Sequence, residues 1–196
     1  MWRLLLAAAF VALSILSPAR GAQFALDRRD ATIVFHVKTL GLLKSSGSFA
    51  QFDIRMIVDE AASDHGVLIA EIDMRSAAMS GDGATERLKG PSWFDVERFP
   101  QSIFTADIPL SDLRPKSRIS GRYRLRDRVA PVALTILAAE PEYGLSGEIV
   151  AIRFRAEGAI DRLAYGMDDL KTVVSRKVGI EVNARLVRVE EGEYAP

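Results

Sequence analysis

The chain has 196 residues, of which 48% are hydrophobic and 27% charged, and it contains no cysteine. Lys and Arg number 26, as do Asp and Glu, so no basic field favours binding to a nucleic-acid backbone. The lack of Cys excludes disulfides, thiolate zinc sites and cysteine nucleophiles, and two histidines are too few for a His-rich metal centre.

The N-terminal residues have the pattern of a secretory signal peptide. Arg3 supplies a positive charge, residues 4–16 form an apolar run broken only by Ser14, and Pro18 ends the run before Ala19-Arg20-Gly21. The run is shorter than the ~20 residues that span a bilayer, so cleavage is expected rather than a retained anchor. The favoured position is after Gly21, and the alternative is after Ala22. We therefore expect residues 22–196 to be exported to the periplasm, and ~175 residues fit a single domain.

From residue 23 onward, apolar and polar side chains alternate with period two, which is typical of half-buried strands. The segment Ile119–Arg126 is the clearest example, because Arg122, Arg124 and Arg126 all fall on its polar face. The pattern predicts a short strand at 23–26 followed by eight long ones, at 32–38, 52–58, 68–75, 104–110, 119–126, 132–138, 152–160 and 178–185.

Turn sequences separate most of these strands, and short connections imply antiparallel neighbours. The predicted turns are Ser45–Gly47, Ser63–Gly66, Arg114–Ser117 and Glu140–Gly144. Only the connection from 77 to 101 is long and irregular, with a predicted helical turn at 85–89. Long amphipathic antiparallel strands favour an eight-stranded β-barrel over a sandwich. A membrane barrel would carry aromatic girdles, which the pattern lacks.

The inward faces of the predicted barrel contain many small residues. An eight-stranded barrel is just filled by large side chains, so small ones leave room for an apolar ligand. Alternatively, they fit the taper of the barrel or face large neighbours. These residues are Ala70, Ala106, Gly121, Ala138, Ala156, Gly158 and Ala184.

A series of short motifs follows the chain in a fixed order. They are Val34-Phe35-His36-Val37, Leu40-Gly41, Gly47-Ser48-Phe49, Phe52, Leu88-Lys89-Gly90, residues 93–100 (WFDVERFP), Phe104, Ile119-Ser120-Gly121, Leu125, Pro131-Val132, Phe154-Arg155-Ala156, Arg162 and Tyr165-Gly166-Met167. Together they resemble the YceI family of periplasmic polyisoprenoid-binding proteins over nearly the whole mature sequence. The resemblance implies a lipocalin-like antiparallel β-barrel that encloses a long isoprenoid chain. The histidine that the family usually has before Leu88 is replaced here, so no role of it carries over.

The sequence contains no arrangement typical of catalysis. Gly144-Leu145-Ser146-Gly147 has the wrong spacing for a nucleophile elbow, and there is no phosphate-binding loop. His36 falls on an outward face and His65 in a polar turn, and adjacent carboxylates such as Asp168 and Asp169 are usually solvated. We therefore expect no enzyme activity, cofactor or metal.

The favoured hypothesis is a non-catalytic exported protein that holds or carries an isoprenoid lipid, either a polyprenyl chain or an isoprenoid quinone, in an apolar barrel cavity. The residues predicted to line the cavity are Phe35, Phe52, Ile54, Ile72, Phe104, Tyr123, Leu134, Phe154 and Ile180. Trp93, Phe94 and Tyr165 are predicted at the mouth, where an aromatic ring offers a polar tip beside an apolar body. The loop 77–101 either gates the barrel or plugs one end.

The rival hypothesis is an interaction or structural module with a filled barrel core and its function on the outer surface. Dimerisation through an exposed edge or through the face of His36 fits both hypotheses. The arginines Arg122, Arg124 and Arg126 either contact phosphates at a membrane surface or pair with acidic residues on adjacent strands.

Overall fold

The computed structural model describes residues 21–41, 43–59 and 65–189. The predicted signal peptide therefore lies, up to residue 20, outside the described residues. Among the helices within the described ranges, none has the length and apolar character needed to cross a membrane.

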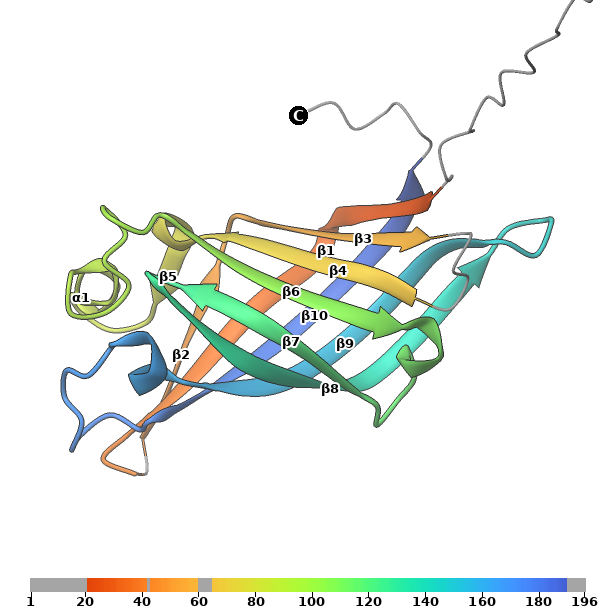
Figure 1. The fold of residues 1–196 in the computed structure, drawn as a ribbon. Coiled ribbons are helices and arrows are strands. Elements are labelled where there is room, and N and C mark those ends of the chain that lie inside the picture. Colours follow the sequence, from red (N-terminus) through yellow and green to blue (C-terminus); the bar gives the residue numbers. More distant parts are fainter. Residues whose placement is uncertain (1–20, 42, 60–64, 190–196) are drawn as a thin grey trace, which may run out of the picture.

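Eight antiparallel strands close into a barrel, which confirms the predicted lipocalin-like architecture (Figure 1). Each strand pairs with the next around the barrel, and β10 pairs with β1 to close it. Alternation of apolar and polar residues lets every strand bury one face and solvate the other. In order around the barrel the strands are β1 (Gly21–Thr39), β3 (Phe52–Asp59), β4 (His65–Asp73), β6 (Gln101–Pro109), β7 (Arg118–Leu125), β8 (Arg128–Tyr143), β9 (Ile149–Asp161) and β10 (Lys177–Val189).

Two further strands extend the sheet at one end of the barrel. They are β2 (Leu43–Phe49), which pairs with the second half of β1, and β5 (Ala77–Met79), which pairs with β2. The predicted turn at Ser45–Gly47 is therefore wrong. Gly47 lies opposite Phe35 in this ladder, and a Cβ on Gly47 would collide with the Phe35 ring. The glycine makes room for an aromatic ring from the neighbouring strand rather than forming a turn.

Bulges explain two other differences from the predicted strands. In β1 the register shifts between Asp27 and Thr32, which joins the two predicted strands at 23–26 and 32–38 into one. In β8 the register shifts after Ile136, so that Ala139, and not Ala138, lies opposite the inward-facing Phe154. The predicted inward position of Ala138 is therefore wrong, because a bulge reverses the side-chain alternation. Strand β8 also continues through the predicted turn at 140–144, and the hairpin closes where the Gly144 amide donates to the Glu148 carbonyl (2.8 Å).

Helical segments are short and lie at the ends of the barrel. The predicted helical turn at 85–89 is present as α1 (Ala84–Lys89), and three 3-10 turns accompany it: η1 (Met74–Ser76), η2 (Leu110–Asp112) and η3 (Arg162–Tyr165). In Figure 1, α1 and η3 lie at the left end of the barrel, while η2 and the β8–β9 turn lie at the right. The left end therefore carries the long connections that cover the barrel.

Candidate functional site

The barrel encloses an apolar cavity of about 380 Å³. Its wall is formed by inward side chains of the barrel strands, and its end is covered by α1, the residues after α1 and the segment between η3 and β10. Polar groups on the wall are few: Thr39, Ser45, Ser80, Arg87, Tyr123 and Arg162. A volume of this size is within the ~300 to 1,000 Å³ of ligand pockets in proteins.

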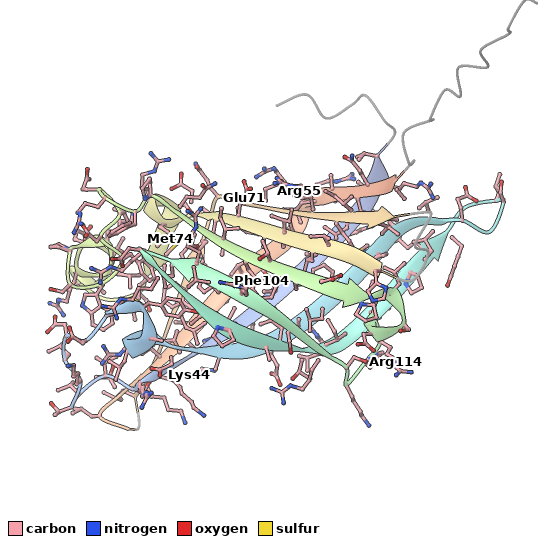
Figure 2. All side chains as sticks on the ribbon, viewed as in Figure 1. Lys44, Arg55, Glu71, Met74, Phe104 and Arg114 are labelled. Carbon is pink, nitrogen blue, oxygen red and sulfur yellow. The ribbon has the colours of Figure 1, made fainter. Side chains whose placement is uncertain are left out.

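The other half of the barrel is filled by its own side chains. Met56, Ile108 and Leu186 are each about 1% exposed there, and the space between them and their neighbours amounts to about 10 Å³. That is at the lower limit of the ~10–15 Å³ that a single water molecule needs. The barrel is thus hollow at the end that α1 covers and packed solid at the other. Phe104, near the middle of the barrel in Figure 2, belongs to the cavity wall.

The segment after α1 closes the cavity with an aromatic cluster. Phe94 is buried and packs on Phe35 and Phe49, with ring centroids 6.3 Å and 6.0 Å away. Phe35 and Phe49 themselves are 5.3 Å apart. Leu88 buries the inner side of α1 against the same core. We call residues 80–99 the cap, because these apolar side chains fasten it onto the barrel end.

Asp95 forms a turn inside the cap and connects it to neighbouring segments. Its backbone adopts a left-handed conformation (φ 51°), which Asp tolerates better than most residues. The Asp95 amide donates to the Gly90 carbonyl (2.9 Å), and the buried carboxylate lies 3.3 Å from an Arg98 nitrogen and 3.9 Å from an Arg126 nitrogen. Arg126, in the β7–β8 turn, also donates to the Gly166 carbonyl (3.1 Å). Arg126 therefore connects the cap to the segment that follows η3.

Arg162 organises the second cover of the cavity, the segment between η3 and β10. Its side chain is 1% exposed, and it donates hydrogen bonds to four backbone carbonyls. Burial lowers the pKa of Arg162 from its ordinary value, although a guanidinium stays charged in proteins. The guanidinium also lies over the Trp93 ring, 5.1 Å from its centroid, which is a cation–π contact. The accepting carbonyls belong to Met167, Asp169, Val174 and Ser175.

Two tyrosines lie side by side near the cavity. Tyr123 is on its wall, and its hydroxyl hydrogen-bonds the Ser102 hydroxyl (2.9 Å). Tyr165 packs edge-on against Tyr123 at 5.7 Å between centroids. Burial raises the pKa of both tyrosines to about 12, so both are neutral hydroxyls. The Tyr165 hydroxyl and the Trp93 indole nitrogen are buried without a hydrogen-bond partner among the described residues.

The structure brings ten of the twelve predicted site residues together around the cavity. These are Phe35, Ile54, Ile72, Trp93, Phe94, Phe104, Tyr123, Leu134, Phe154 and Ile180. Phe52 and Tyr165 are buried but do not line it. Tyr165 is separated from the cavity by Tyr123, on which it packs. Whether the ten bind a ligand stays a prediction.

Several wall residues were not predicted from the sequence. Arg162 is the most informative, because it continues the inward alternation of Gly158 and Ile160 on β9, and a charged residue at an inward position could have drawn attention to it. Leu170, Val173 and Val174 line the cavity from an irregular segment, where no periodic pattern identifies them.

Small inward residues do not create the cavity in the way that the sequence suggested. Of the seven, only Ala70 lies on the cavity wall. At Gly121 a Cβ would lie 2.5 Å from the Phe104 ring, and at Gly158 it would lie 2.6 Å from a Leu134 methyl. Large side chains cover these glycines, which was the alternative interpretation. Ala106, Ala156 and Ala184 are buried in the packed core.

The outward histidine takes part in a polar cluster on the barrel wall. His36 Nδ1 is 2.8 Å from the Ser46 hydroxyl, and Nε2 is 2.8 Å from a Glu181 carboxylate oxygen. Asp168 pairs with Lys171 at 2.9 Å on the surface. Within the described ranges, no group of three or more His, Cys, Asp or Glu side chains is placed to hold a metal ion.

Comparison with known proteins gives one family match. A family model described as the YceI-like domain matches residues 24–186. No functionally curated protein matches the chain.

Several solved structures have a similar fold. Burkholderia cenocepacia BcnA superimposes with a TM-score of 0.66 at 18% identity, over 82% of this chain and 98% of that one. A polyisoprenoid binding domain from Saccharophagus degradans, implicated in plant cell wall breakdown, has a TM-score of 0.60 at 13% identity, over 85% and 98%. A YceI protein of Campylobacter jejuni has a TM-score of 0.53 at 17% identity, over 74% and 85%. At these identities the likeness concerns the fold.

Proposed function

This chain belongs to the YceI-like family, and from that premise we propose that it is a non-catalytic protein that holds or carries an isoprenoid lipid, either a polyprenyl chain or an isoprenoid quinone, in its barrel. The observation that carries the proposal is the apolar cavity of about 380 Å³ at the covered end of the barrel. The polyisoprenoid binding domain of Saccharophagus degradans has the same fold, which supports this ligand class.

The chemistry of the wall favours retention of a hydrocarbon chain. At ~0.8 kcal/mol per buried CH₂, each five-carbon unit contributes roughly 3 to 4 kcal/mol before ordering costs. Aromatic and branched side chains such as Phe104, Phe154 and Ile54 provide the contact surface. Shape and burial then select the ligand, and no reactive group is required.

Two polar groups of the wall, Tyr123 and Arg162, are engaged in structural hydrogen bonds among the described residues. Tyr123 is a neutral hydroxyl bonded to Ser102, and Arg162 donates to backbone carbonyls. Neither group is paired with a base that would activate a nucleophile. These features support a binding role over an enzymatic one. The rival hypothesis of a filled core is disfavoured, because only the far half of the barrel is packed.

Location and processing form part of the same proposal. We infer that the protein acts in the periplasm after cleavage of its signal peptide, as a single mature domain of residues 22–196. A homodimer would fit this role without altering the cavity.

A matched pair of substitutions tests the proposal. Ala70→Leu adds volume to the cavity, whereas Ala106→Leu adds the same volume to the packed core. The first variant should stay stable and bind less lipid, while the second should lose about 1–3 kcal/mol of unfolding free energy. Trp93 is the only tryptophan outside the predicted signal peptide, so its fluorescence reports titration with a short-chain polyprenol. Undiminished binding by Ala70→Leu would contradict the proposed site.

A further inference from the structure

The outer wall of the barrel presents unpaired arginines on β7. Arg118, Arg122 and Arg124 are exposed, and Arg122 and Arg124 are about 7 Å apart on one face, the spacing of alternate residues in a strand. Within the described part of the chain, none of the three forms a hydrogen bond or ion pair. Their charges are therefore available to an external partner.

The residues beside these arginines are neutral, and several are apolar. Arg124 lies between Ile103 of β6 and Val129 of β8. Arg122 lies between Thr105 and Pro131. The acidic cross-strand partners that the sequence allowed are thus absent at these positions of the described sheet. Val129 is 49% exposed, so apolar surface accompanies the positive charge.

Arg55 and Arg185 on the outer wall are neutralised by acidic neighbours, whereas Arg155 on β9 makes no ion pair among the described contacts. Arg55 and Glu71, which Figure 2 labels on β3 and β4, are 3.0 Å apart. Arg185 is 2.6 Å from Glu142 and 3.0 Å from Asp27. The β7 arginines have no such acidic partner among the described contacts. Asp107, on the same wall of β6, makes no ion pair with Arg122 among the described contacts.

The unpaired arginines are close to the covered end of the cavity. Arg124 is the penultimate residue of β7, and Arg126 in the following turn donates to Gly166. Gly166 begins the segment that carries Leu170, a wall residue of the cavity that is 40% exposed. A partner held by Arg122 and Arg124 would therefore lie close to the segment between η3 and β10, which is one of the two covers of the cavity.

We propose that this basic wall, formed by Ile103, Arg122, Arg124, Val129 and Pro131, docks on the surface of a membrane that contains anionic phospholipid. The proposal extends the proposed function, because a carrier of a membrane lipid needs its cavity mouth beside the bilayer. Guanidinium groups bind phosphate oxygens in a bidentate way, and the flanking apolar side chains enter the interfacial region. Each basic residue near such a surface strengthens binding about fivefold.

Vesicle binding tests the proposal. The protein, isolated from cells that express the full chain, is sedimented with vesicles of phosphatidylcholine alone or with one third phosphatidylglycerol. Binding to the anionic vesicles is expected to be stronger and to fall in high salt, where charges are screened. Arg122→Gln/Arg124→Gln should weaken it by about 25-fold. The control Arg114→Gln/Lys116→Gln removes the same charge at the opposite end, where Figure 2 labels Arg114, and should leave binding nearly unchanged.

The outcomes separate this proposal from the proposed function. Polyprenol dispersed without vesicles should bind equally to the wild type and to Arg122→Gln/Arg124→Gln, since both arginines face away from the cavity. Equal affinity for both vesicle types, or equal losses in the two double variants, would refute the docking surface even if polyprenol binds. An acidic protein would then be the better candidate partner for the wall.

Discussion

Replacing Arg162 by Met should strongly destabilise the covered end of the barrel. Met keeps the apolar stem but removes the guanidinium that donates to four carbonyls. The Met167 carbonyl is buried, and an unsatisfied buried acceptor costs ~1–3 kcal/mol. The other three carbonyls are partly buried and regain some hydration. The expected loss is therefore about 3–5 kcal/mol of unfolding free energy, a large share of the ~5–15 kcal/mol of a typical domain.

Urea unfolding measures this loss, and two probes locate it. Trp93 fluorescence reports the local environment, since the guanidinium lies over the indole ring, while far-ultraviolet circular dichroism reports the sheet. The matched control is Arg176→Met, whose exposed ion pair with Asp161 is on the surface, so little change is expected. If Arg162→Met lowers the free energy of unfolding by less than ~1 kcal/mol, or by no more than Arg176→Met does, the stabilising role assigned to these hydrogen bonds is wrong.

Three further predictions concern packing, pH and access. Gly121→Ala should lower the unfolding free energy by about 1–3 kcal/mol, because its Cβ would lie 2.5 Å from both the Phe104 ring and the Thr105 carbonyl oxygen. In thermal unfolding, Phe104→Leu should reverse only the part of this loss that comes from the ring. Hydrogen bonds from Arg185 hold the pKa of Glu142 below its ordinary 4.5. The stabilisation that this ion pair gives to the folded state is therefore present above pH ~4.5 and is lost as the pH falls through the lowered pKa. The stability difference between wild type and Arg185→Gln in urea should therefore be largest at neutral pH and shrink as the carboxyl of Glu142 is protonated in acid; a difference independent of pH would contradict this assignment. Phe94→Ala should speed lipid uptake in stopped-flow fluorescence more than it changes affinity, because it loosens the cap from Phe35 and Phe49; unchanged rates would leave the cap as a fixed wall.

Period-two alternation predicted the barrel because it records burial on one face directly. Each of the eight closing strands overlaps one predicted segment, although the segments 68–75, 104–110 and 119–126 run one or two residues past the ends of β4, β6 and β7. Ten of the twelve predicted site residues reach the cavity. The alternation misleads only where the backbone departs from regular pairing. At Leu137 the extra residue of a bulge reverses which side of β8 faces inward, so Ala138 was misplaced.

Glycines were harder to interpret from the sequence. The sequence pattern predicts a turn at Gly47 and free volume in the barrel at Gly121. In the structure both glycines are covered by a phenylalanine ring from a neighbouring strand. The sequence contains no information on which large side chain leans over which glycine. The carbonyls that accept hydrogen bonds from Arg162 could not be predicted either. Every residue has a backbone carbonyl, so the residue types of an irregular segment do not indicate which carbonyls accept.

Mass spectrometry of the protein as it leaves its own cell tests the central claim most directly. The protein is purified without denaturant, its intact mass is measured under native conditions, and the bound material is then extracted with solvent. Our account predicts an added mass that solvent releases and that fragments in five-carbon isoprenoid steps. The proposal that the barrel is a lipid carrier would be contradicted if the purified protein had no added mass and also did not bind added polyprenol.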